Sequence, residues 1–72
     1  MEDRRNRIGE ALELSGMKQI ELSELTGLSP AQINSWKNNR WQPNRSAICL
    51  MAKALNVSEA WLAGYDEPIH AK

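Results

Sequence analysis

The chain has few of the residues on which disulfide scaffolds and metal sites are built, with one cysteine, Cys49, and one histidine, His70. A single cysteine cannot close an intramolecular disulfide, which favours a reducing compartment. One cysteine and one histidine are too few for a tetrahedral zinc site, so we expect no metal and no other cofactor. Phenylalanine is absent, and the apolar residues are mostly alanine, leucine and isoleucine, which favours helices over strands.

Long apolar runs are missing as well. No segment approaches the roughly 20 apolar residues that a membrane-spanning helix needs. The N-terminal stretch MEDRRNR has no apolar segment behind its charges, so it is not a signal peptide. We therefore expect a soluble, cytoplasmic protein with no membrane partner. Its 72 residues suffice for one small domain, near the lower size limit for a core without disulfides or metal.

The sequence also lacks the residue sets that catalysis requires. It has no nucleophile paired with a histidine, no pair of carboxylates in an apolar setting and no glycine-rich phosphate loop. A domain of this size offers little room for a closed pocket. We therefore expect neither an enzyme nor a site for a small-molecule substrate.

Five segments show helical periodicity, and none shows the alternation of a strand. The first three predicted helices bury one stripe each, whereas the fourth is apolar nearly all round and is expected to be central and buried. The predicted helices cover residues 3–15, 18–26, 30–38, 45–55 and 58–64. The residues expected to be buried include Ile8, Leu12, Leu14, Leu22, Leu25, Ile33, Trp36, Ile48, Leu50, Met51, Leu55 and Trp61.

Residues with a local reason to start or stop a helix mark the helix ends. Serine and asparagine accept hydrogen bonds from free N–H groups at a helix start, and proline fits the first helical position. Glycine and asparagine tolerate the left-handed backbone that follows a helix end. The predicted starts are Ser29-Pro30, Asn44 and Ser58, and the predicted stops are Gly16, Gly27, Asn38-Asn39, Asn56 and Gly64.

The second and third predicted helices, joined by a turn that contains Gly27, have the arrangement of a helix-turn-helix unit. In such a unit the first helix, Lys18 to Thr26, crosses the DNA backbone, and the second, Pro30 to Asn38, lies in the major groove. Many helical bundles also contain short helices and glycine turns. The spacing alone is therefore only moderately specific.

Two longer stretches, KQIELSELTGLSPAQINSWKNNRWQPN and LMAKALNVSEAWLAGYD, strengthen this interpretation. They resemble the lambda-repressor-like family of helix-turn-helix regulators, which includes the Cro and phage repressors, over about residues 4–66. The chain departs from the usual family residues at Ser23, Lys37 and Asn39. The residues that carry the resemblance are Gln19, Ser23, Gly27, Ile33, Trp36, Pro43 and the closing segment from Val57 to Gly64.

This resemblance implies an all-α domain of five short helices over residues 1–66, with residues 67–72 as a tail or the start of a linker. It implies sequence-specific binding to a double-stranded DNA operator by a repressor or regulator from a phage, prophage or bacterium, in the bacterial cytoplasm or nucleoid. Members of the family usually act as homodimers on half-sites about one helical turn apart. The chain is either the N-terminal domain of a longer repressor or a free-standing Cro-like repressor. The alternative is an antitoxin-type module whose main partner is a protein toxin.

The resemblance also implies which residues contact DNA. Glutamine and asparagine both donate and accept hydrogen bonds, so a bidentate contact from Gln32 to adenine is feasible, and Ala31 suits a thymine methyl group. The residues implied to face bases are Pro30, Ala31, Gln32, Asn34 and Ser35. Those implied to contact the sugar–phosphate backbone are Gln19, Lys37, Asn38, Asn39, Arg40 and Arg45.

Charge is distributed in agreement with this assignment, although nine basic and nine acidic residues leave the chain formally neutral. None of the acidic residues lies between Leu25 and Ser58. That interval contains the cations Lys37, Arg40, Arg45 and Lys53. DNA binding depends on cations placed near phosphates and not on net charge.

Two points stay open at the level of the sequence. Trp41 either packs under its loop or lies against a sugar–phosphate strand. The N-terminal cations Arg4, Arg5 and Arg7 are either solvated or form an arm that reaches the DNA backbone.

Overall fold

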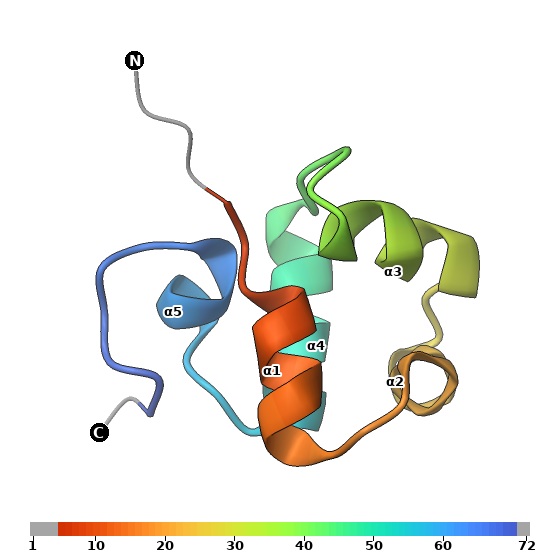
Figure 1. Cartoon of the computed structure of the whole chain (residues 1–72), viewed down its shortest axis with the longest axis horizontal. Helices are drawn as coiled ribbons and strands as arrows, with labels where there is room; N and C mark the ends of the chain where they lie inside the picture. The colour runs from red at the N-terminus through yellow and green to blue at the C-terminus, as the bar shows by residue number, and fades with distance from the viewer. Residues whose placement is uncertain (1–4, 71–72) are drawn as a thin grey trace.

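A computed structural model describes residues 5–70, which form five α-helices and no strand (Figure 1). The all-α prediction with five short helices is confirmed. The sequence predicts that the first helix starts at residue 3, but it begins at Ile8, and residues 5–7 are not helical. Within the described residues, no helix has the length and apolar character needed to cross a membrane. The helices are α1 (Ile8–Ser15), α2 (Gln19–Thr26), α3 (Pro30–Lys37), α4 (Arg45–Leu55) and α5 (Glu59–Ala63).

The helix ends form at the residues whose side chains or backbone freedom predict them. Left-handed backbone follows every helix, at Gly16, Gly27, Asn39, Asn56 and Gly64. Three helix starts are capped by a side-chain oxygen that accepts a hydrogen bond from a backbone N–H three residues later. These bonds join Ser29 to Gln32 at 3.1 Å, Asn44 to Ala47 at 2.8 Å and Ser58 to Trp61 at 3.3 Å.

Helix α4 packs against α1, α2 and α5 and supplies the largest share of the core. The prediction that it is buried all round is wrong. Leu50 is 44% exposed, because neighbouring helices cover only one face of α4. The residues on the covered face are Ala47, Ile48, Met51, Ala52 and Leu55.

Two further leucines are exposed against expectation, Leu14 at 65% and Leu25 at 64%. Leu14 points away from the face of α1 that buries Ile8. Helix α2 buries only Leu22 and Ser23, since its contacts with α3 and α4 cover a narrow strip. Apolar spacing identifies these helices as amphipathic but does not determine how wide the covered strip is.

Arg7 joins the start of α1 to the end of α5. Its backbone N–H donates to the carbonyl of Leu62 at 2.9 Å, and its Nη1 donates to the carbonyls of Trp61 at 2.6 Å and Tyr65 at 2.9 Å. The guanidinium also lies over the Trp61 ring, 5.3 Å from its centroid. Carbonyls at a helix end favour a cation. For Arg7 the alternative of a solvated cation is therefore wrong, and Arg4 lies outside the described residues.

The described residues after α5, 64–70, form no helix, yet they return to the core. The backbone N–H of Ser58 donates to the carbonyl of Ile69 at 2.6 Å, and the Ile69 side chain packs against the hydrophobic cluster. This segment therefore covers the connection between α4 and α5.

Replacing Ile69 by alanine tests this packing. Ile69→Ala removes partly buried apolar atoms and should lower the free energy of unfolding by about 1 kcal/mol. Urea unfolding followed by circular dichroism measures the change. Glu67→Ala, at an exposed position in the same segment, is the control and should change the stability by less than about 0.5 kcal/mol. Equal stability of Ile69→Ala and the unmodified chain would show that packing of the Ile69 side chain adds no stability.

Candidate nucleic-acid interface

Helix α3 is attached to the rest of the domain by two buried side chains. Ile33 is fully buried and Trp36 is 8% exposed. They occupy positions i and i+3 of a helix that packs against α1 and α2, so the opposite face points to solvent. The residues predicted to face bases surround that outer face. Pro30, Ala31, Gln32 and Asn34 are exposed, and Ser35 is partly buried.

Hydroxyl groups on α2 fix the turn that leads into α3. The Oγ of Ser23 donates to the carbonyl of Leu28 at 2.6 Å. The Oγ1 of Thr26 donates to the carbonyl of Leu22 at 2.8 Å and accepts from the N–H of Leu28 at 3.2 Å. The left-handed backbone at Gly27 reverses the chain between these bonds. Ser23 therefore contributes a hydrogen bond and not only a small volume, which the sequence alone does not indicate.

Three amide side chains on α3 and at its C-terminal cap make local hydrogen bonds. The Oε1 of Gln32 accepts from the N–H of Ser29 at 3.4 Å, which completes a capping box at the helix start. The Nδ2 of Asn38 donates to the Oδ1 of Asn34, also at 3.4 Å. Both bonds are at the long limit for a hydrogen bond, so shorter bonds to a ligand can replace them.

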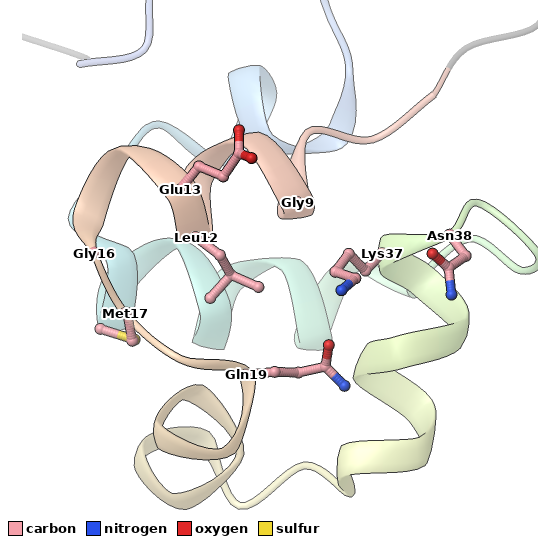
Figure 2. Close-up of a pocket in the computed structure, with 8 residues that line it drawn as sticks. All are labelled: Gly9, Leu12, Glu13, Gly16, Met17, Gln19, Lys37 and Asn38. Atoms are coloured by element: carbon pink, nitrogen blue, oxygen red, sulfur yellow. The ribbon is translucent and has the colours of Figure 1, made fainter.

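An open pocket of about 580 Å³ lies beside α3, between it and helices α1 and α2 (Figure 2). Three residues predicted to contact the DNA backbone line it, namely Gln19, Lys37 and Asn38. The Nε2 of Gln19 donates to the carbonyl of Pro30 at 3.3 Å, so Gln19 joins the starts of α2 and α3. The structure thus brings residues from both helices of the unit to one place.

The stem of Lys37 packs over Gly9 of α1. A Cβ atom at Gly9 would lie 3.3 Å from the Cγ of Lys37, closer than ordinary van der Waals contact. The absence of a side chain at Gly9 therefore allows Lys37 to lie along α1. Figure 2 shows Lys37 projecting into the pocket from the end of α3.

Three amide side chains hold the loop that follows α3. The Nδ2 of Asn6 donates to the carbonyl of Trp36 at 2.8 Å and to the Oε1 of Gln42 at 3.1 Å. The Oδ1 of Asn39 accepts from the N–H of Asn6 at 3.0 Å and from the Nε2 of Gln42 at 3.2 Å. The Oδ1 of Asn6 accepts from the N–H of Ile8 at 3.1 Å. We call Asn6, Asn39 and Gln42 the amide cluster.

The backbone closes α3 at the same point. The N–H of Asn39 donates to the carbonyl of Trp36 at 2.9 Å, and the N–H of Arg40 donates to the carbonyl of Ser35 at 2.9 Å. With Asn39 at a φ of 59°, these bonds form a Schellman motif. Asn39 and Arg40 are both predicted to contact the DNA backbone, but their side chains are placed differently. The Asn39 side chain is hydrogen-bonded within the domain, whereas the Arg40 side chain is exposed.

The cations near the end of α3 lie on three consecutive segments, namely α3, the following loop and α4. Lys37 ends α3, Arg40 lies in the loop and Arg45 begins α4, and all three side chains are exposed. Trp41, beside Arg40, is 68% exposed, so the alternative in which it packs under the loop is wrong. Nothing in the sequence indicates a role for Asn6 or Gln42. The bonds between Asn6 and Ile8 and between Gln42 and Asn39 are local, but the bonds that Asn6 makes to Trp36 and Gln42 join positions at least 30 residues apart in the sequence.

Taken together, α2, the fixed turn and the exposed face of α3 form a helix-turn-helix unit. The helix-turn-helix family model matches residues 8–62, most of the chain. The chain therefore belongs to the lambda-repressor-like helix-turn-helix family, whose members are DNA-binding regulators. Comparisons with curated proteins and with solved structures give no match. Within the described residues, no three His, Cys, Asp or Glu side chains gather where they could hold a metal ion.

A matched pair of asparagines tests the amide cluster. Asn39 and Asn56 share a φ of 59°, but only Asn39 belongs to the cluster. Glycine adopts this conformation without steric cost, so Asn56→Gly should raise the free energy of unfolding by about 0.5 kcal/mol. Asn39→Gly should lower it by about 1 kcal/mol, because the lost side-chain bonds outweigh the relief of strain. Urea unfolding of both variants measures the difference. An equal gain for both would show that the cluster adds no stability.

Proposed function

We propose that this chain binds a double-stranded DNA operator sequence-specifically, as the DNA-binding domain of a transcriptional repressor or regulator from a phage, prophage or bacterium. The observation that carries the proposal is the exposed outer face of α3, which Ile33 and Trp36 hold against the core. The major groove admits an α-helix. Helix α3 enters the groove by this face, with its N-terminal residues towards the base edges.

Specificity comes from the residues around that face, Pro30, Ala31, Gln32, Asn34 and Ser35. Gln32 exchanges its long bond to Ser29 for a bidentate contact to adenine N6 and N7. Ala31 and Pro30 are apolar and exposed, which suits contact with a thymine methyl group. Asn34 and Ser35 supply further donors and acceptors one turn along the helix.

Affinity comes from contacts with the sugar–phosphate backbone on either side of the groove. Gln19, at the start of α2, and Lys37, at the end of α3, bond phosphates from the two sides of their shared pocket. Asn38 and Asn39 at the end of α3, the loop cation Arg40 and the first residue of α4, Arg45, continue along the strand. No carboxylate lies between Leu25 and Ser58 in the sequence, and the carboxylate among the residues that line the pocket is Glu13 of α1.

The proposed function needs neither catalysis nor a cofactor. The chain binds its operator as a homodimer, with two copies of α3 in successive major grooves on half-sites about one helical turn apart. It works in the bacterial cytoplasm or nucleoid. The absence of net charge makes non-specific binding weaker than that of a basic domain.

Loss of the Arg40 cation tests the backbone contacts. Arg40→Ala should weaken binding to every duplex and reduce the slope of log affinity against log salt by about 0.9, the value for one phosphate contact. Fluorescence anisotropy over a series of salt concentrations measures this slope. Lys53→Ala makes the same change in net charge near the other end of α4, and it should leave the slope unchanged. Equal slopes for Arg40→Ala and the unmodified chain would contradict the assignment.

Loss of the Gln32 amide tests base reading. Gln32→Ala should relax the base preference at one operator position by about 1–3 kcal/mol, while the salt slope stays the same. Competition between a selected duplex and its single-base variants measures this preference. Circular dichroism checks that the total helix content survives the loss of the bond between the Gln32 side chain and the N–H of Ser29. Unchanged discrimination at every operator position would show that Gln32 does not read a base.

A further inference from the structure

The loop between α3 and α4 holds two large side chains in solvent without a helix to support them. Arg40 and Trp41 are both exposed, and they are the residues that separate Asn39 from Gln42 in the chain. The amide of Asn39 and the amide of Gln42 bond each other at 3.2 Å. A side-chain hydrogen bond therefore joins the two residues that flank Arg40 and Trp41, and it closes the base of the loop.

Asn6 attaches this closed loop to the body of the domain. Its side chain is 7% exposed, which makes it one of two buried polar side chains in the described part of the chain. Both N–H donors of its Nδ2 are used, on the carbonyl of Trp36 and on the Oε1 of Gln42. Its backbone N–H reaches Asn39, and its Oδ1 accepts from the N–H of Ile8. One buried amide thus joins the start of α1, the end of α3 and the loop.

A buried amide adds only modest net stability, since each of its hydrogen bonds replaces one to water. Its bonds do, however, permit only one arrangement of the groups that they join. Figure 1 shows the segment before α1, in red, and the loop after α3, in green, at the same end of the molecule. Asn6 therefore determines how the loop is oriented relative to α3.

We propose that Asn6 is a positioning residue for DNA binding, which acts through the amide cluster to present Arg40 and Trp41 together to the sugar–phosphate backbone. The proposal rests on the proposed DNA-binding function and adds a role for two residues, Asn6 and Trp41. Arg40 donates to a phosphate, and the Trp41 indole packs against the adjoining deoxyribose. A loop held in its bound orientation loses less conformational entropy when DNA binds.

Asn6→Ala tests the role directly. In titrations of a mixed-sequence DNA duplex over a range of salt, it should lower affinity and reduce the salt slope by about 0.9, as Arg40→Ala does. Trp41→Ala should lower affinity with no change in slope, because the indole is uncharged. Gln42→Ala is a second variant that leaves every buried residue in place, and it should change affinity and slope in the same direction as Asn6→Ala.

A double-mutant cycle separates positioning from a general loss of stability. When Arg40 is already alanine, Asn6→Ala should reduce the slope no further, since it acts through Arg40. Ser58→Ala is the control, because it removes a helix cap beyond the other end of α4. It destabilises the domain, yet it should leave the salt slope unchanged. A DNA-free readout is hydrogen exchange at the Arg40 amide, which should accelerate roughly tenfold in Asn6→Ala.

The outcomes distinguish the two proposals. If the unmodified chain shows no salt-dependent binding to duplex DNA, the proposed function fails and the positioning role fails with it. If the unmodified chain and Arg40→Ala behave as expected, but Asn6→Ala keeps the full slope, only the positioning role is overturned. Additive slope losses in the double variant would also overturn it, as would unchanged exchange at the Arg40 amide.

Discussion

The attachment of α3 to the core through Trp36 is the constraint on which the rest of the interface depends. An eight-residue helix is not stable alone in water, and α3 buries only Ile33 and Trp36. The indole of Trp36 packs into the core, and its backbone carbonyl accepts bonds from Asn6 and Asn39. One residue therefore sets both the rotation of α3 about its axis and the direction in which the chain leaves it. Every side chain on the outer face takes its position from this attachment.

The described residues include two buried polar side chains, and these bond the segments at opposite ends of α3. Ser23 bonds the turn that enters the helix, and Asn6 bonds the loop that leaves it. A buried polar group must be hydrogen-bonded, and its partners are then restricted in direction as well as distance. Apolar packing positions helix α3 as a whole, whereas Ser23 and Asn6 position the segments at its two ends. The loop that leaves α3 carries the exposed cation Arg40, so in the proposed complex with DNA a small shift of this loop would alter affinity while the fold persists.

Local features were the most predictable from the sequence. Ser29, Asn44 and Ser58 start helices because a cap needs only a partner three residues away. Leu14, Leu25 and Leu50 were misplaced because the extent of burial depends on which helices pack nearby, and helical periodicity does not contain that information. The role of Arg7 was missed for a related reason, since its partners are carbonyls at the end of α5. The outer face of α3 could be expected from Ile33 and Trp36, but the amide cluster depends on contacts between distant parts of the chain.

Selection of bound sites from random duplex DNA tests the central claim, that the outer face of α3 reads a specific operator. The operator sequence and the half-site spacing come from the same experiment. The account predicts enrichment of a near-palindromic site with half-sites about one helical turn apart. Retention of random sequences with no enriched site, or of no DNA at all, would contradict it.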